Sequence, residues 1–198
     1  MSFRLEEKIP LTKSDSCLLF NEIKKKGFKS LYPRRKIKSI YFDNATYQSF
    51  YDSIEGSLPR KKIRLRSYPL SPVINFNLEI KTSSIEGRFK TTQFVNNEKN
   101  KKFMVNGFLD NFYGHLRPIC TVTYEREYYI KDGIRITLDT SITYQNYQNE
   151  IILFYEPKEV IEVKASSKTS KDFLVKLIPY SRHRFSKFCQ AITSLNIQ

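Results

Sequence analysis

The chain has 198 residues, of which 34 are Lys or Arg and 20 are Asp or Glu, so its net charge is +14. This length suits a single domain over residues 1–198 with a sizeable core. The charge favours an anionic partner: a nucleic acid, an acidic lipid or a phosphorylated small molecule. The sequence contains no GxGxxG dinucleotide motif and no GxxxxGK[ST] phosphate loop, so these two glycine-rich nucleotide sites are excluded.

The cysteine, histidine and hydrophobic patterns argue against several further classes of protein. Cys17, Cys120 and Cys189 are far apart and form no CxxC pair, which argues against a thiolate metal site or a disulfide framework. We expect them to be buried free thiols. The histidines have no zinc-ligand spacing. No apolar stretch approaches ~18 residues and the charged N-terminus lacks a signal-peptide core, so we expect no transmembrane span and a cytoplasmic protein.

The first half of the chain is predicted to alternate strands with short helices. A strand over residues 3–9 precedes a helix that Ser14 or Asp15 caps and that ends near Lys26 and Gly27. Pro10 is expected to end the first strand early. The other elements expected here are a strand over 37–42, a turn or short helix over 47–51, a hairpin of 60–68 with 73–81, a strand over 88–95, a loop over 97–102 and a helix over 103–115.

The second half repeats the strand pattern and ends in helices. Lys131-Asp132-Gly133 predicts a tight turn between strands over 119–130 and 134–140. Strands over 151–155 and 160–164 and helices over 171–178 and 185–195 complete the chain. About eight strands with flanking helices predict an α+β fold built on a closed antiparallel β-barrel, whose tunnel can be wet and charged.

Basic residues occupy every other position in several of these strands. Lys62, Arg64 and Arg66 alternate with Ile63 and Leu65. Residues two apart on a strand point to the same face, so each run places its charges on one side and apolar groups on the other. Several such runs indicate an enclosed cationic face. Such a face needs an anionic occupant, because burying unpaired like charges is very costly.

The charged runs and their neighbours also form an ordered set of motifs. In chain order they are Arg4-Leu5-Glu6-Glu7-Lys8, Ser39-Ile40-Tyr41-Phe42-Asp43, Arg60-Lys61-Lys62-Ile63-Arg64-Leu65-Arg66-Ser67-Tyr68, Leu78-Glu79-Ile80-Lys81 with Lys90, Tyr124-Glu125-Arg126-Glu127, Ile134-Arg135-Ile136-Thr137-Leu138-Asp139, Ile161-Glu162-Val163-Lys164 and Arg184-Phe185-Ser186-Lys187-Phe188. Over nearly the whole chain this order resembles the VTC domain, the polyphosphate polymerase domain of the triphosphate tunnel metalloenzyme (CYTH-like) superfamily.

The resemblance implies a barrel that holds a triphosphate along its axis and transfers the ATP γ-phosphate onto a growing polyphosphate chain. It implies a divalent metal ion, Mn²⁺ or Mg²⁺, held by Glu162. The phosphate- and nucleotide-binding residues that it implies are Lys8, Arg64, Arg66, Lys81, Lys90, Tyr124, Arg126, Arg135, Arg184, Ser186 and Lys187. Among the matched residues, the expected catalytic ones are Arg64, Arg66, Lys81, Arg126 and Lys187. The implied partners are ATP and inorganic polyphosphate, with no specific nucleic acid.

These residue types suit phosphoryl transfer, which requires positioning and charge neutralisation more than a protein nucleophile. Arg binds two phosphate oxygens at once, while Lys supplies a mobile point charge. A carboxylate such as Glu162 suits a hard divalent cation. Two roles stay open for Glu6, Glu79 and Asp139: metal binding, or pairing with the basic residues of the empty tunnel.

Two other functions fit the same sequence. A hydrolase of triphosphate or polyphosphate would use the same tunnel and metal, with water as the acceptor. A non-catalytic module that binds polyphosphate, RNA or acidic lipid would need only the net charge of +14. The sequence also leaves open a membrane-protein partner and the oligomeric state.

Overall fold

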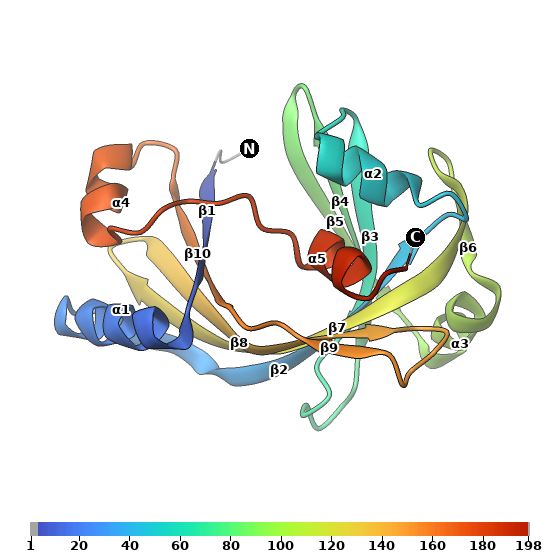
Figure 1. The fold of residues 1–198 in the computed structure, drawn as a ribbon, viewed down its shortest axis with the longest axis horizontal. Coiled ribbons are helices and arrows are strands. Elements are labelled where there is room, and N and C mark those ends of the chain that lie inside the picture. Colours follow the sequence, from blue (N-terminus) through green and yellow to red (C-terminus); the bar gives the residue numbers. More distant parts are fainter. Residues whose placement is uncertain (1–3, 198) are drawn as a thin grey trace. The chain divides into compact units, whose positions relative to one another are not determined.

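The computed structural model describes residues 4–197 and contains ten strands and five helices (Figure 1). The strands are β1 (Arg4–Leu11), β2 (Lys29–Asp43), β3 (Arg60–Ser67), β4 (Phe76–Ser84), β5 (Gly87–Val95), β6 (Phe108–Asp110), β7 (Gly114–Lys131), β8 (Ile134–Asn146), β9 (Leu153–Tyr155) and β10 (Glu159–Ser166). The helices are α1 (Lys13–Lys25), α2 (Gln48–Glu55), α3 (Asn97–Asn106), α4 (Lys171–Leu177) and α5 (Lys187–Ser194). Within residues 4–197, no helix combines the length and the apolar character needed to span a membrane.

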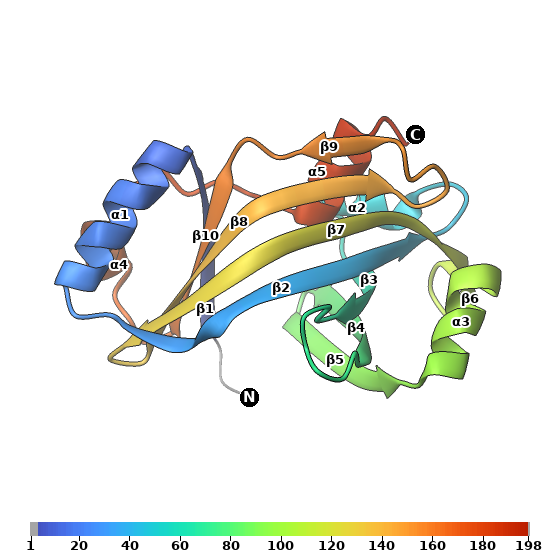
Figure 2. The ribbon, with the colours of Figure 1, turned by 90° about the horizontal axis from the view of Figure 1, so that it is seen from below.

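The ten described strands form one sheet, in which eight are neighbours in the order β1-β10-β8-β7-β2-β3-β4-β5 (Figure 2). Outside this path, β6 pairs with β7 and β9 pairs with β8. The ladders β1–β10, β10–β8, β2–β3, β3–β4 and β4–β5 are antiparallel, so the predicted antiparallel α+β fold is confirmed. The strand number exceeds the prediction of about eight because β6 and β9 are three-residue strands outside the path. In the described residues the end strands β1 and β5 are not paired, so closure into a barrel stays a prediction.

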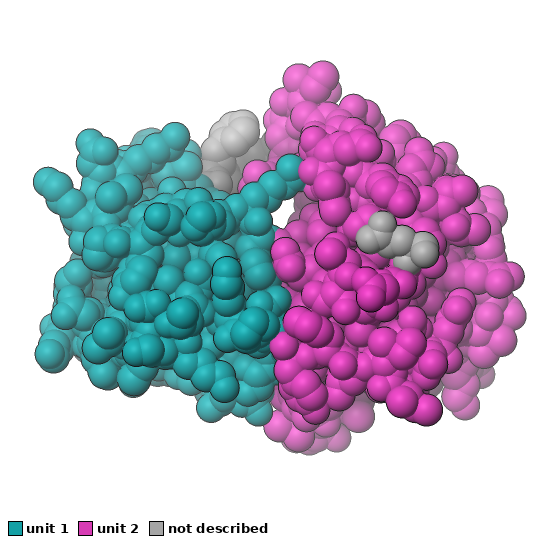
Figure 3. All heavy atoms as spheres, in the orientation of Figure 1, with its two compact units in different colours: residues 1–35, 124–142, 156–185 teal, residues 36–123, 143–155, 186–198 magenta. Residues whose placement is uncertain are grey.

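The chain divides into two compact units, which Figure 3 colours separately. Unit 1 comprises residues 1–35, 124–142 and 156–185, and unit 2 comprises residues 36–123, 143–155 and 186–198. The long strands β2, β7 and β8 contribute residues to both units.

The core of unit 1 lies between helices α1 and α4 and one apolar sheet face. Ile9, Ile136 and Ile161, from β1, β8 and β10, are fully buried on this face. Leu19 of α1 and Leu174 of α4 pack into the same cluster. Because side chains alternate along each strand, the charged residues between these apolar ones lie on the opposite face.

The core of unit 2 follows the same rule on strands β3, β4 and β5. Ile63, Leu65 and Leu78 are buried together with Val95, and Leu116 of β7 joins them. The predicted hairpin of β3 and β4 is confirmed, and its register places Ile63 opposite Ile80. The intervening basic residues of both strands therefore share the other face.

Pro10 does not end the first strand, contrary to our expectation. β1 continues to Leu11, and Pro10 lies opposite Val160 in the ladder with β10. β1 is an end strand of the path, and proline, which cannot donate a ladder hydrogen bond, is tolerated on such edges. The predicted helix after it is present, but Thr12 caps it instead of Ser14 or Asp15. Residue 3 of the predicted first strand lies outside the described residues.

Three further expectations were wrong in whole or in part. The predicted loop over 97–102 is the start of helix α3, and most of the predicted helix over 103–115 is replaced by β6 and the start of β7. Helix α3 has no buried residue, so it lacks the apolar stripe by which a helix is recognised in a sequence. Of the three free cysteines, Cys120 is buried as expected, but Cys189 is half-buried and Cys17 is exposed.

Candidate functional site: two charged clusters

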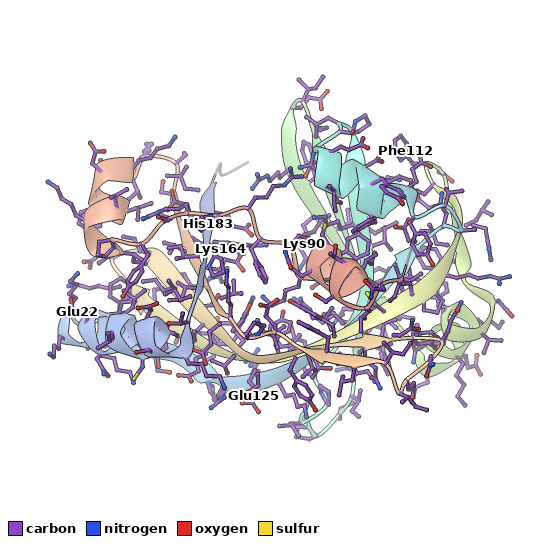
Figure 4. All side chains as sticks on the ribbon, in the orientation of Figure 1. Glu22, Lys90, Phe112, Glu125, Lys164 and His183 are labelled. Carbon is purple, nitrogen blue, oxygen red and sulfur yellow. The ribbon has the colours of Figure 1, made fainter. Side chains whose placement is uncertain are left out.

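One charged cluster covers the polar sheet face of unit 1, and we call it the carboxylate cluster. Its residues are Glu6 and Lys8 of β1, Tyr124 and Arg126 of β7, Arg135, Thr137 and Asp139 of β8, and Glu162 and Lys164 of β10. The register places Lys8 opposite Glu162 and Glu6 opposite Lys164. Figure 4 labels Lys164, which projects from β10 away from helix α1.

Arg126 joins two buried carboxylates of this cluster. Its Nε lies 2.5 Å from Oδ1 of Asp139 and its Nη2 lies 2.7 Å from Oδ2, which is a bidentate pair. The same Nη2 lies 3.4 Å from Oε2 of Glu162. The guanidinium also lies over the ring of Tyr124, 5.3 Å from its centroid. Asp139 is thus held by Arg126, which favours charge pairing as its role.

Glu162 is surrounded by cations although it is 6 % exposed. Lys164 Nζ lies 2.7 Å from its Oε1 and 3.7 Å from Oε2 of Glu6, so one ammonium group lies between two carboxylates. Burial by itself would raise the pKa of Glu162, but Arg126, Lys164 and Lys8 outweigh it and hold the pKa well below its usual range. Glu162 is therefore ionised at neutral pH, as a metal ligand must be.

The donor set of this cluster fits a divalent metal that is shared with phosphate. Within residues 4–197, no group of three or more His, Cys, Asp or Glu side chains could hold a metal ion without other ligands. Glu162 and Glu6, however, both approach Lys164 Nζ and supply hard oxygen donors. Mg²⁺ is commonly bound by one or two carboxylates together with substrate phosphates and water, so two carboxylates are sufficient.

Two buried polar atoms of the carboxylate cluster lack a hydrogen-bond partner. They are Nε of Arg135 and Oγ1 of Thr137, both on the polar face of β8. Thr137 is 3 % exposed and lies opposite Glu162 in the ladder. Buried polar groups are nearly always paired, so a water molecule, an ion or a ligand is expected to pair with these two atoms.

The second cluster lies on the polar face of β3, β4 and β5 in unit 2, and we call it the cationic cluster. Its residues are Lys62, Arg64, Arg66, Glu79, Lys81 and Lys90, that is, five basic side chains and one carboxylate. Figure 4 labels Lys90 on β5. The charge balance differs from that of the carboxylate cluster, where Lys8, Arg126, Arg135 and Lys164 meet three carboxylates.

Glu79 binds three of these cations. Arg64 donates from Nε and Nη2 to Oε2 at 2.8 and 2.6 Å, and Lys90 donates to Oε1 at 2.7 Å. Arg66 Nη1 lies 3.6 Å from the same Oε2. Burial alone would raise the pKa of Glu79, but the positive charges of Arg64 and Arg66 and the Lys90 hydrogen bond lower it to about 2. Glu79 therefore serves to hold the basic side chains in place.

Helix α5 is attached to the cationic cluster through two side-chain pairs. Ser186, which caps α5, accepts a hydrogen bond from Lys62 Nζ at 3.0 Å. Arg64 Nη1 donates to the Tyr41 hydroxyl at 2.9 Å, and the Tyr41 ring stacks on Phe188 of α5 with centroids 5.1 Å apart. These contacts place the start of α5, with Lys187 as its first residue, beside the cluster.

The predicted phosphate-binding residues are divided between the two units. Unit 1 contains Lys8, Tyr124, Arg126, Arg135 and Arg184, together with the predicted metal ligand Glu162, and unit 2 contains Arg64, Arg66, Lys81, Lys90, Ser186 and Lys187. Strand β1, which Pro10 was expected to end early, places Lys8 opposite Glu162 in the carboxylate cluster. Lys8 also donates a hydrogen bond to the backbone carbonyl of Phe185 at 3.0 Å. Arg184 is exposed in an irregular segment between α4 and α5. The roles of all these residues stay predictions.

The two-residue period placed Lys62 on the predicted cationic face with Arg64 and Arg66, but Lys62 was not among the predicted phosphate-binding residues. Tyr41 was not predicted to be a site residue. Tyr41 lies opposite Arg64 in the β2–β3 ladder, but this pairing is visible only once the register is known.

The fold occurs in proteins from distant organisms. A candidate adenylate cyclase from Bacillus halodurans is 14 % identical, with 93 % of this chain and 94 % of that chain covered and a TM-score of 0.61. A protein of Pyrococcus horikoshii is 17 % identical, with coverages of 96 % and 99 % and a TM-score of 0.60. A candidate adenylyl cyclase from Hippeastrum, described as having a dominant triphosphatase activity, is 14 % identical, with 96 % of each chain covered and a TM-score of 0.62.

These similarities show that the chain shares the fold of these three proteins. Residues 3–196 match the sequence profile of the VTC domain, and the chain belongs to this family. The predicted resemblance is therefore confirmed over almost the full sequence. No curated protein is detectably similar in sequence.

Proposed function

We propose that this VTC domain is a metal-dependent polyphosphate polymerase that transfers the γ-phosphate of ATP onto inorganic polyphosphate. The observation that carries the proposal is the cationic cluster, in which Arg64, Arg66 and Lys90 contact the buried carboxylate of Glu79 and Lys62 and Lys81 share the same sheet face. Such an excess of ordered positive charge requires a polyanion. Membership of the VTC family supports a phosphate chain as that polyanion.

In this proposal the cationic cluster binds and orients phosphate groups. Arg64 and Arg66 are already ordered by Glu79, so little side-chain entropy is lost when they bind phosphate oxygens. Their charges neutralise the oxygens of the transferred group and of its neighbours, which lowers the barrier to attack by another anion. A terminal oxygen of the polyphosphate chain forms the new P–O bond to the γ-phosphorus, the bond to the β-phosphate oxygen breaks, and ADP leaves.

The carboxylate cluster contributes the metal ligands and further phosphate contacts. Glu162 and Glu6 would hold Mn²⁺ or Mg²⁺, which supplies positive charge to phosphate oxygens when bound. Arg135 and Thr137 each have a buried polar atom without a hydrogen-bond partner. Phosphate oxygens would accept hydrogen bonds from both side chains. Closure of the sheet into a barrel and a single domain over residues 1–198 belong to the same proposal.

Triphosphate hydrolysis is the second candidate function. The observation that favours it is the similarity in fold to the Hippeastrum protein, whose description names a dominant triphosphatase activity. Hydrolysis would use the same basic residues, with water in place of the polyphosphate oxygen as the acceptor. The two activities therefore differ in their products and not in the charges that they require.

One reaction distinguishes these functions. Purified protein is incubated with ATP and either Mn²⁺ or Mg²⁺, the products are separated on a gel stained for polyphosphate, and free phosphate is assayed in parallel. A ladder of long chains with little free phosphate would support the polymerase. Free phosphate without chains would support the hydrolase. If neither product forms with either metal, the chain is a polyanion-binding module and the enzymatic proposal is wrong.

A further inference from the structure

We propose that unit 1 binds a small zwitterionic molecule of the amino-acid class in a pocket between helix α1 and the sheet face that this helix covers. We call it the α1 pocket. Its volume is about 370 Å³, which lies within the range of small-molecule sites. Every residue that lines it belongs to unit 1. The inference goes beyond the proposed function, because this pocket is separate from both charged clusters.

The α1 pocket lies on the opposite sheet face from the carboxylate cluster. Leu138 of β8 lines it and packs with Phe20 of α1 in the core of unit 1. Asp139, the next residue of β8, points to the other face and pairs with Arg126. The helix contributes residues three and four apart, which share one side of it: Lys13, Ser16, Cys17 and Phe20.

Ser16 carries a buried hydroxyl that needs a partner. Its side chain is 1 % exposed, and within residues 4–197 its Oγ forms no hydrogen bond. A serine inside a helix often donates to the carbonyl four residues earlier, but the carbonyl of Thr12 is bonded to the backbone N–H of Ser16 and not to its hydroxyl. Buried hydroxyls are nearly always paired, so a polar group in the α1 pocket should complete this one.

Two opposite charges in the α1 pocket indicate the class of ligand. Glu159 of β10 lies opposite Leu11, two residues before Lys13 begins α1, so the two charges come from adjoining elements. Both residues line the pocket, and neither side chain forms an ion pair or a hydrogen bond with another described residue. A water molecule would pair with Ser16 alone. A zwitterion would pair its carboxylate with Lys13, its ammonium with Glu159 and either group with Ser16.

The other charged residues of the α1 pocket already have partners. Arg34 forms an ion pair with Glu125, and its Nη2 donates to Oγ1 of Thr140 at 3.0 Å. Glu127 accepts a hydrogen bond from the hydroxyl of Tyr129 at 2.6 Å. These residues form a fixed polar wall, so the ligand charges are left to Lys13 and Glu159. The apolar side chains of the pocket would contact the carbon atoms of an amino acid.

Cys17 provides a reporter inside the α1 pocket, because its thiol is exposed and lines it. The rate at which this thiol reacts with dithionitrobenzoate is measured with each of the common amino acids at millimolar concentration, without ATP. Cys17→Ser identifies the part of the signal that comes from Cys17, since Cys189 is only half-buried. We expect at least one amino acid to slow the reaction of Cys17 with a saturable dependence on its concentration, which gives its dissociation constant.

The analogues of that amino acid test the two charges. The amine that lacks the carboxylate and the acid that lacks the ammonium should each bind about tenfold more weakly, since each loses one charge-assisted contact. In Lys13→Met the amino acid and its amine should bind equally, and in Glu159→Gln the amino acid and its acid should bind equally. If no amino acid slows the reaction of Cys17, or if neither variant changes the preference, the inference is wrong.

Ser16→Ala tests the buried hydroxyl, and Ser14→Ala is the matched control. Ser14 is exposed on the same helix and does not line the pocket. Isothermal titration calorimetry with the same amino acid should show about tenfold weaker binding to Ser16→Ala, because one hydrogen bond to a charged group is lost. Ser14→Ala should bind as the unmodified protein does. Equal affinities of the two variants would overturn the role of Ser16.

Thermal unfolding separates ligand binding from a merely structural role of Ser16. Without the amino acid, Ser16→Ala should unfold at the same temperature as the unmodified protein or at a higher one, because it removes an unpaired buried hydroxyl and alanine favours the helix. With the amino acid, its melting temperature should rise less than that of the unmodified protein. A large destabilisation without ligand would show that the hydroxyl already has a partner, and the inference would be wrong.

Discussion

Glu79 and Glu162 are both buried and both surrounded by cations, yet their surroundings differ in kind. Glu79 contacts Arg64, Arg66 and Lys90 and is the only carboxylate of its cluster. Glu162 shares Lys164 with a second carboxylate, Glu6. A lone carboxylate among cations balances their charge, whereas two carboxylates near one ammonium group can also bind a divalent cation. The contacts thus assign different uses to two residues of the same type.

Glu162→Gln is predicted to lower the rate of ATP turnover by about 100-fold and to leave the fold intact. The amide keeps the shape of the side chain but is a poor ligand for Mg²⁺ or Mn²⁺. Steady-state rates are measured at saturating metal, and circular dichroism checks the fold. Glu22→Gln removes the same charge from the exposed side of helix α1 and should leave turnover unchanged. Equal turnover by Glu162→Gln and the unmodified protein would refute the metal assignment.

The low pKa of Glu79 predicts a defined pH dependence of stability. Its pKa is about 2 in the folded protein against 4.5 without perturbation, so its contribution is complete above pH 4.5 and is lost as the pH falls toward 2. A shift of this size corresponds to roughly 3 kcal/mol. Urea unfolding of the unmodified protein and of Glu79→Gln measures this contribution of Glu79. The difference between their free energies of unfolding should shrink as the pH falls from 4.5 to 2.

A difference that stays constant across that pH range would show that Glu79 is not stabilised by Arg64, Arg66 and Lys90. Tripolyphosphate provides a second check at neutral pH. Glu79→Gln leaves these cations without their carboxylate, so added tripolyphosphate should restore more stability to this variant than to the unmodified protein.

Among the elements, the junction of α3 and β6 depends on one glycine. Gly107 ends helix α3 with a positive φ of +70°, and a Cβ at this position would lie 2.0 Å from the carbonyl oxygen of Leu116. A backbone atom cannot move aside as a flexible side chain does. The short strand β6 follows immediately, so the turn at Gly107 determines where it pairs with β7.

Gly107→Ala is therefore predicted to lower the free energy of unfolding by more than about 3 kcal/mol. Gly114→Ala is the matched control, because Gly114 has a φ of +72° but no atom lies within 4 Å of the position that its Cβ would occupy. It should lose only about 1 to 2 kcal/mol, the cost of the left-handed conformation. Urea unfolding compares the two variants, and equal losses would show that the contact with Leu116 has no effect.

Helices and strands whose apolar residues recur at a regular spacing could be predicted from the sequence, and those without such a spacing could not. The β3–β4 hairpin was predicted because charged and apolar residues alternate from Lys62 to Arg66. Helix α3 was missed because its polar surface has no apolar stripe, although Asn96 at its cap and Gly107 at its end are typical signals. Pro10 was misjudged because its effect depends on whether β1 is an edge strand, which the sequence does not state.

In the candidate site, too, some features could be predicted from the sequence and others could not. The sharing of one face by Arg64 and Arg66 follows from their spacing alone. The partner of each charge could not be predicted, since Glu79 is 15 residues from Arg64 along the chain, and Ser186 is 124 residues from Lys62. Such contacts depend on the register of the sheet and on the placement of α5, which no local pattern specifies.

At the scale of the whole molecule, the net charge of +14 opposes the folded state through self-repulsion. The structure lessens this repulsion with carboxylates that contact several basic residues, as Glu79 and Glu162 do. The cationic cluster still has five cations for one carboxylate. Binding of a phosphate chain should therefore stabilise the protein beyond the general effect of salt.

Tripolyphosphate at about 100 times its dissociation constant is predicted to raise the free energy of unfolding by about 2.7 kcal/mol. The measurement is urea unfolding at fixed pH, with sodium chloride of equal ionic strength as the control. Chloride should have a smaller effect, because it screens charges without bridging several ammonium and guanidinium groups. Equal stabilisation by both salts would show that the folded protein has no specific phosphate site.

The alternation of the two units along the chain has a consequence for how the protein is made. Unit 1 begins at the N-terminus but includes residues up to 185, and unit 2 begins at residue 36 and includes the C-terminus. Every residue up to 185 must therefore be synthesised before unit 1 is complete, and every residue up to 198 before unit 2 is complete. For the same reason, no single cut releases one unit intact, and neither unit could be gained or lost by joining or deleting one stretch of a gene. The two charged clusters are inherited together.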